Sequence, residues 1–115
     1  MQEELIIEKR ELERFIVNVK IEERDTGRCL GYSANMHKRG MMITSTEPLP
    51  LDRVLKVKLV HIQDEDEIIE IPLDIVGVWR TMDKTSGFHN TGFKIINTSP
   101  KQDKAINTVI EELAI

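Results

Sequence analysis

Apolar and polar residues alternate along much of the chain with the two-residue period of half-buried β-strands. Over residues 15–22 every second side chain is apolar, so one face of this segment suits a protein core and the other suits water. Residues 54–62 repeat the pattern, with Lys56 and Lys58 on the face opposite their apolar neighbours. The same reasoning predicts further strands over residues 29–34, 41–43, 68–80 and 91–96.

Turn-forming residues separate these segments. They are predicted to form turns or polar loops over residues 25–27, 35–40, 63–66 and 82–90. Residues 48–50 hold two prolines, which lack the amide hydrogen that a central strand needs, so this segment is expected to connect strands. Because residues 68–80 are too many for one regular strand, we expect Pro72 or Gly77 to mark a bulge or a bend.

The C-terminal segment carries the signals of a capped amphipathic helix. Ser99 suits the N-cap, Pro100 suits the first helical position, and Gln102 stands three residues after Ser99, as in a capping box. An apolar stripe follows at helical spacing, formed by Ile106, Val109, Ile110 and Leu113. We therefore predict a helix over residues 99–114 that lies against the strands.

Short strands followed by one helix define the predicted fold class. We expect a mostly β protein, a small antiparallel β-barrel of six to seven strands with a C-terminal α-helix. Residues 1–13 mix apolar and charged side chains, and are predicted to form a flexible or helical N-terminal arm. Residues 14–115 are then the barrel domain, a length suited to a single core.

The charge distribution narrows the choice of partner. A net charge of −4 disfavours DNA or RNA, because a long polyanion needs a broad basic surface. A small anion needs only a local basic pocket. Two short groups of basic residues could form such a pocket. The first consists of Lys9, Arg10 and Arg14, and the second of Lys38 and Arg39.

The remaining chemistry is sparse. Cys29 is the single cysteine, which excludes an intramolecular disulfide, and its place in an apolar pattern predicts a buried thiol. His37, His61 and His89 are too scattered in sequence to predict a metal site. No catalytic motif is present, so we expect no enzyme activity and no cofactor. Without an apolar run of membrane length or a signal peptide, we expect a cytoplasmic protein that does not insert into membranes.

Arg10 and Arg14 form the first candidate binding group. Positions four residues apart share a face in a helix and in a strand, so both guanidinium groups can reach one ligand. A guanidinium grips a phosphate with two parallel hydrogen bonds, stacks on a purine, or donates to the O6 and N7 edge of guanine. The alternative is a solvated pair that contacts neighbouring glutamates.

The second candidate group lies in the polar interruption over residues 35–40. Asn35 offers a donor and an acceptor, while Gly40 permits a positive φ angle and close approach of a ligand to the backbone. The alternative is a polar turn that simply reverses the chain. Trp79, the sole tryptophan, either packs against the core or the helix or stacks at the edge of a ligand.

Together the two groups resemble the signature of the PilZ family, RxxxR before the first strand and D/NxSxxG in a later turn. This chain has Arg10-x-x-x-Arg14 and Asn35-x-His37-x-x-Gly40 in that order. The resemblance continues through the apolar residues 41–43, the connection over residues 47–50, the strand with Trp79, the pair at 92–93 and the final helix.

The resemblance implies a domain that binds the bacterial second messenger cyclic di-GMP on the outer surface of its barrel. The N-terminal arm would fold over the ligand and present a surface to an effector protein, in a monomer or a homodimer. Motility and biofilm control are among the outputs of the family. The implied ligand contacts are Arg10, Arg14, Asn35, His37 and Gly40, with Lys9, Lys38, Arg39 and Trp79 as secondary candidates.

The chain departs from the family at His37, which stands where a small hydroxyl residue is usual. An imidazole still donates or accepts a hydrogen bond, but it is bulkier than a hydroxymethyl group. A second hypothesis is therefore a PilZ-like interaction module that does not bind nucleotide because of His37.

Overall fold

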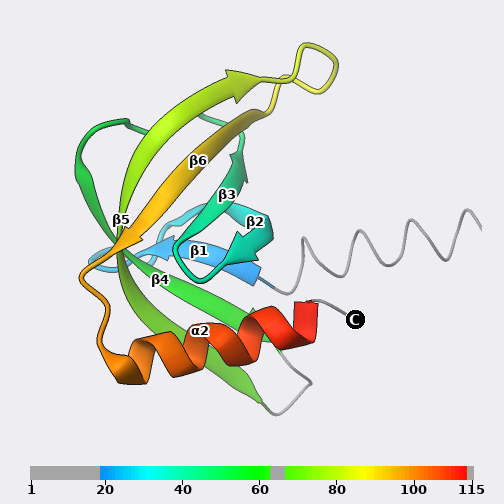
Figure 1. Cartoon of the computed structure of the whole chain (residues 1–115). Coiled ribbons are helices and arrows are strands. Elements are labelled where there is room, and N and C mark those ends of the chain that lie inside the picture. Colours follow the sequence, from blue (N-terminus) through cyan, green and yellow to red (C-terminus); the bar gives the residue numbers. More distant parts are fainter. Residues whose placement is uncertain (1–18, 63–66, 114–115) are drawn as a thin grey trace, which may run out of the picture.

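The computed structural model describes residues 19–62 and 67–113, which form an antiparallel β-barrel with a helix beside it (Figure 1). Within these residues the strands are β1 (Val19–Glu23), β2 (Cys29–His37), β3 (Gly40–Ser45), β4 (Val54–Ile62), β5 (Ile68–Met82) and β6 (His89–Ile96), and the helix is α2 (Pro100–Leu113). The barrel closes in the order β1-β2-β3-β6-β5-β4. The predicted fold class is confirmed, whereas the arm expected over residues 1–13 lies outside the described residues.

The core consists of the inward side chains that the alternation predicts. In β1, Val19 and Ile21 are fully buried, as are Val57 and Leu59 in β4. Their neighbours on the outer face are charged. Glu22 lies 2.9 Å from Lys20 and 3.7 Å from Lys58, and the hydrogen bond from Lys20 lowers the pKa of the Glu22 carboxyl. Alternation thus separates an apolar interior from an ion-paired surface.

The helix begins at the predicted capping box. The Gln102 backbone N–H donates to Ser99 Oγ (3.2 Å), and the Ser99 N–H donates to Gln102 Oε1 (2.8 Å). Farther along, Ile106 and Val109 are fully buried and belong to the same apolar cluster as the barrel interior. The apolar face of the helix is therefore part of the hydrophobic core.

Pro72 lies inside β5, opposite Lys58 of β4, without costing a ladder hydrogen bond. Its carbonyl accepts from the Gln102 side-chain amide (2.6 Å), so it points toward α2 and away from β4. In a strand the nitrogen and carbonyl of one residue point to the same side. The hydrogen missing from Pro72 is therefore one that β4 does not use. The predicted bulge of this strand lies instead between Gly77 and Trp79.

Strands extend farther into the predicted loops than the sequence suggested. Asn35 and His37 belong to β2, and the chain reverses through Lys38 and Arg39 alone. A register shift between Ser33 and Asn35 makes this possible, because it allows polar side chains that follow a buried stretch to turn to the outer face. The loop expected over residues 82–90 likewise shortens to residues 83–88.

The prediction of a buried thiol at Cys29 is wrong, since this side chain is exposed. Ile21 pairs with Gly31 but Glu22 pairs with Cys29, so the register between β1 and β2 shifts at this point. Cys29 therefore lies opposite an outward residue rather than an inward one. No described helix has the length and apolar character needed to cross a bilayer.

Candidate functional site

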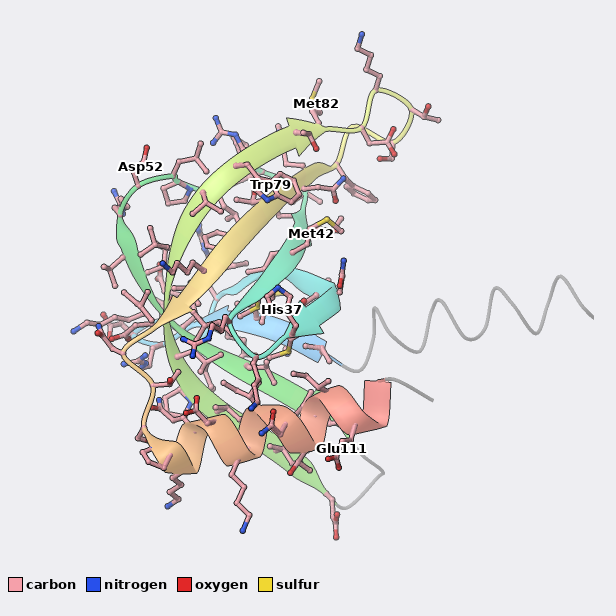
Figure 2. The ribbon with its side chains drawn as sticks, viewed as in Figure 1. His37, Met42, Asp52, Trp79, Met82 and Glu111 are labelled. Atoms are coloured by element: carbon pink, nitrogen blue, oxygen red, sulfur yellow. The ribbon has the colours of Figure 1, made fainter. Side chains whose placement is uncertain are left out.

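Cross-strand pairing gathers the second sequence motif and the tryptophan on one outer face of the barrel. Asn35 of β2 pairs with Met42 of β3, Met42 pairs with Gly92 of β6, and Gly92 pairs with Trp79 of β5. Residues directly opposite each other point to the same side of a sheet. The four positions therefore form one row across four strands, of which Figure 2 labels Met42 and Trp79.

A second row runs beside the first, toward the turn that joins β2 and β3. His37 pairs with Gly40, Gly40 pairs with Lys94, and Lys94 pairs with Val76. Each row contains one glycine on a central strand, so two diagonally neighbouring positions on β3 and β6 carry no side chain. The face is consequently hollow in the middle and raised at both sides.

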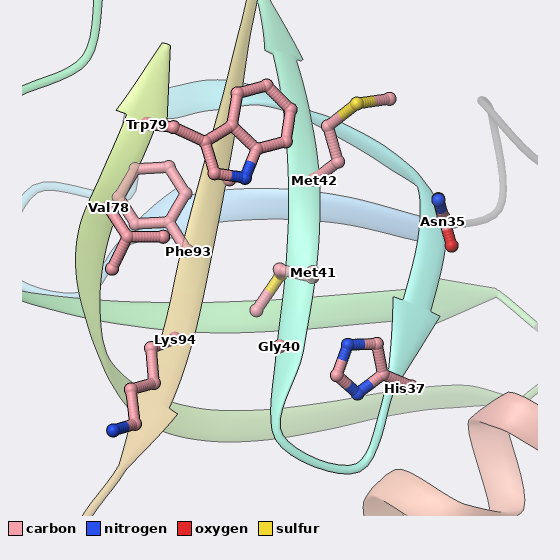
Figure 3. Close-up of a pocket in the computed structure, with 10 residues that line it drawn as sticks. Asn35, His37, Gly40, Met41, Met42, Val78, Trp79, Phe93 and Lys94 are labelled. Atoms are coloured by element: carbon pink, nitrogen blue, oxygen red, sulfur yellow. The ribbon is translucent and has the colours of Figure 1, made fainter.

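This hollow is an open pocket of about 360 Å³, within the range of small-molecule sites. Figure 3 shows Asn35 and His37 on β2 at one side and Trp79 and Val78 on β5 at the other. The residues that line it are Asn35, His37, Gly40, Met41, Met42, Val78, Trp79, Gly92, Phe93 and Lys94. The pocket thus combines apolar walls with an amide, an imidazole, an indole and one cation.

Trp79 lies on the outer surface with its indole against the backbone of β6. Its side chain is 45% exposed, and a Cβ atom added at Gly92 would stand 2.0 Å from the indole Nε1 atom. The sequence left two placements for Trp79, packing against the core or the helix and stacking at the edge of a ligand. The structure does not show the first. The bulge at Val78 explains this, because regular alternation from the buried Ile75 and Gly77 would have pointed Trp79 inward.

His37 covers the other glycine of the pocket. A Cβ atom at Gly40 would lie 3.4 Å from His37 Nε2 and Cε1. The Arg39 backbone N–H donates to His37 Nδ1 (3.3 Å), so the neutral ring carries its proton on Nε2. His37 therefore presents a donor at the glycine floor, where a hydroxyl residue would leave more space.

Gly40 is required for close packing and not for a special backbone angle. Its φ is outside the positive region, which glycines 27, 31 and 87 occupy. A Cβ atom at Gly40 would lie 2.9 Å from the Phe93 carbonyl oxygen. The adjacent turn is fixed from the same side, because the Ile95 N–H donates to the Arg39 carbonyl (2.8 Å). This edge of the pocket is thus held in place by β6.

The structure separates the predicted site residues into three groups. Asn35, His37, Gly40 and Trp79 line the pocket together. Lys38 and Arg39 are exposed in the turn beside it and do not line it. The N-terminal candidates, Lys9, Arg10 and Arg14, lie outside the described residues.

Sequence reasoning missed Lys94 and Met42. Both occupy outward positions of apolar strands, and a single lysine or methionine in such a pattern does not differ from an ordinary surface residue. Only the pairing of Lys94 with Gly40, and of Met42 with Gly92, brings them to the pocket.

Gly92→Ala is expected to displace the tryptophan, since the new methyl group would overlap the indole ring. The displaced ring becomes more exposed, so its fluorescence emission shifts to longer wavelength, and Trp79 is the sole tryptophan in the chain. Gly87→Ala is the control for the spectrum: its φ of 77° is unfavourable for alanine, but nothing lies within 4 Å of an added Cβ atom there. An unchanged spectrum in folded Gly92→Ala protein would contradict this packing.

Comparison with known proteins supports the fold. No protein-family model and no curated protein sequence matches this chain. Among solved structures, the Bacillus subtilis inhibitor of motility (MotI/DgrA) is similar, with a TM-score of 0.56 and 14% sequence identity. The alignment covers 84% of this chain and 47% of that protein, so this chain spans about half its length. At this identity the similarity establishes a shared barrel architecture and nothing finer.

Proposed function

We propose that this domain is a cytoplasmic sensor that binds cyclic di-GMP and couples its level to a partner protein. The observation that carries the proposal is the joining of Asn35, His37 and Gly40 with Trp79 in one pocket on the outer barrel face. These residues come from the second PilZ-like motif and from a distant strand. The proposal assigns the domain no catalytic step and no cofactor. A motility inhibitor with the same fold is consistent with a regulatory role.

The pocket offers the contacts that a guanine nucleotide requires. The exposed indole face of Trp79 provides a stacking surface, and stacking of a base on an aromatic ring contributes about 1–3 kcal/mol. The Asn35 amide carries a donor and an acceptor for the base edge. Lys94 supplies a positive charge at the same pocket for a phosphate.

Arg10 and Arg14 are proposed to complete the site from the N-terminal side. β1 runs antiparallel to β2, with Lys20 opposite Tyr32, so the chain enters β1 beside the end of β2 that carries Asn35 and His37. Arg14 is five residues from Val19, a span of at most about 17 Å of extended chain. This connection keeps the arginines within reach of the pocket side of the barrel, where they would grip phosphate and guanine.

The alternative is a protein-interaction module without nucleotide binding. Its supporting observation is the position of the His37 ring, which lies over Gly40 and occupies space at the pocket floor. If the ring cannot move aside, a guanine base cannot approach the Gly40 backbone.

Isothermal titration calorimetry of the purified protein distinguishes the two functions. The sensor predicts saturable binding of cyclic di-GMP, with weaker binding of GMP and cyclic di-AMP. Arg10→Ala and Arg14→Ala should each weaken affinity roughly tenfold or more, because a hydrogen bond to a charged group contributes about 1.5–3 kcal/mol. Asn35→Ala should weaken affinity by a similar factor, because a bidentate pair between an amide and a base edge contributes about 1–3 kcal/mol. Arg53→Ala, an exposed arginine away from the pocket, is the control and should leave affinity unchanged.

Absence of heat at high ligand concentration would reject the sensor. His37→Ser then tests the alternative, since restored binding would show that the imidazole alone excludes the nucleotide. Continued absence of binding in His37→Ser would reject that explanation as well. Circular dichroism verifies that each variant keeps its fold.

A further inference from the structure

β5 extends beyond the strand that covers its outer edge. β4 begins at Val54, which pairs with Val76, so residues 78–82 of β5 have β6 on one side and no described strand on the other (Figure 1). The connection between β3 and β4 touches this part of the edge at two points. The Asp52 N–H donates to the Gly77 carbonyl (3.0 Å), and Arg80 Nη1 donates to the Leu49 carbonyl (2.8 Å). The barrel thus retains a short open edge.

The phase of the β5–β6 ladder shows which backbone groups face outward. The Asp83 N–H donates to the Phe88 carbonyl (2.9 Å), so the backbone groups of Asp83 point toward β6. In an antiparallel pair the direction of the backbone N–H and C=O groups alternates along the strand. The backbone groups of Thr81 therefore also point toward β6. The N–H and C=O groups of Arg80 and Met82 point away from it, toward the open edge. Within the described residues no strand pairs with Arg80 or Met82 on that side.

Apolar side chains accompany this edge. Val78 and Met82 are each 56% exposed, and Trp79 is 45% exposed. Natural proteins usually protect an open edge with prolines or outward charges. Residues 78–82 contain no proline and only one charged side chain, Arg80, which donates to the Leu49 carbonyl of the same copy and keeps its charge. The edge is therefore suited to pairing with another strand.

We propose that the occupant is the same edge of a second copy of this chain, paired antiparallel about a two-fold axis at Thr81. In this register Arg80 lies opposite the Met82 of the other copy. Both outward N–H groups and both outward carbonyls of each copy then gain a partner across the interface. Thr81 of one copy faces Thr81 of the other copy at the axis, and such threonine pairs stabilise antiparallel sheets.

Charge excludes the neighbouring symmetric registers. An axis at Arg80 would place the two Arg80 residues face to face, and an axis at Met82 would place Arg80 opposite Lys84. Like charges directly opposite each other are destabilising. Of these three registers only the one with its axis at Thr81 avoids both contacts, so the edge can pair with itself in that register. This inference is independent of nucleotide binding.

Disulfide formation across the axis tests the register. The two Thr81 residues form a non-hydrogen-bonded pair, with Cα atoms about 4.5 Å apart, a separation that a disulfide spans. Thr81→Cys in a Cys29→Ser background should therefore form a covalent dimer under mild oxidation. Met82→Cys in the same background is the control, because residue 82 of one copy is displaced by roughly 7 Å along the strand from residue 82 of the other copy. No cross-link in Thr81→Cys, or equal cross-linking in both variants, would overturn the proposal.

Mass measurement with an edge-blocking variant provides the second test. Light scattering after size exclusion should give twice the monomer mass for the wild type at high concentration. Met82→Pro should halve that mass with an unchanged circular dichroism spectrum, because the lost N–H points away from β6. Ile68→Ala removes a similarly exposed side chain (58%) from the paired part of β5 and should remain dimeric. A wild type that stays monomeric at its highest soluble concentration would overturn the proposal, as would a Met82→Pro variant that remains dimeric.

Discussion

Gly31→Ala is expected to lower the free energy of unfolding by about 3 kcal/mol, through a backbone clash and an unfavourable angle. Gly31 has a φ of 156°, and an added Cβ atom would stand 2.4 Å from the Thr44 carbonyl oxygen and 2.9 Å from Ile43 Cγ2. The clash involves the backbone of the adjacent strand β3, so rotation of a side chain cannot relieve it. Chemical denaturation monitored by circular dichroism measures the loss.

Gly27→Ala is a control that has a positive φ but no clash. Gly27 also has a positive φ, of 73°, but nothing lies within 4 Å of an added Cβ atom. Its substitution should therefore cost only the conformational term, about 1 kcal/mol. Equal losses for the two variants would show that the contact between β2 and β3 at Gly31 is looser than the structure indicates.

The second large effect is expected at the helix. Ile106→Ala should reduce the free energy of unfolding by about 2–5 kcal/mol, the usual range for truncating a buried isoleucine. Ile106 is fully buried in the apolar cluster that includes barrel residues such as Leu73 and Ile75. The loss arises because the cavity lies between the helix and the strands, where neither element can close it alone.

Thr108→Ala is the matched control on the same helix. Its side chain is exposed and donates to the Lys104 carbonyl one turn earlier (3.1 Å). Surface substitutions of this kind usually change stability by about 0.5 kcal/mol or less. If Ile106→Ala were as mild as Thr108→Ala, α2 would not be part of the cooperative folding unit.

The pocket and the open edge share one strand segment, which has a consequence for both proposals. Trp79 lines the pocket, while its neighbour Arg80 directs its backbone groups to the edge. A bulge at Val78 is common to both features. Variants for one proposal are therefore best chosen at residues that the other does not use, such as Asn35 for ligand binding and Met82 for pairing.

Local features were predictable because their causes lie within a few residues. The capping box of Ser99 and Gln102 needs only residues three apart. The burial of Val19 and Ile21 follows from alternation with charged neighbours. The turn at Gly27 follows from the freedom of glycine to adopt a positive φ.

The composition of the pocket was only partly predictable. Asn35 and Gly40 were identified because they stand close together in a motif, and the structure places them in one pocket. The contributions of Lys94, Met42 and Gly92 required the pairing of β3 with β6. That pairing joins segments about fifty residues apart, and no local signal specifies its register.

The class of fold follows from the sequence, because two-residue alternation and a capped apolar stripe leave few ways to bury the core of this chain. Which residues share the outer face depends on how the strands pair. Register shifts between Ser33 and Asn35 and between Gly77 and Trp79 turn Asn35 and Trp79 outward, and Gly40 and Gly92, which are diagonal neighbours on β3 and β6, place no side chain between them. A side chain's direction in a sheet depends on its register with other strands, and residues distant in sequence set that register.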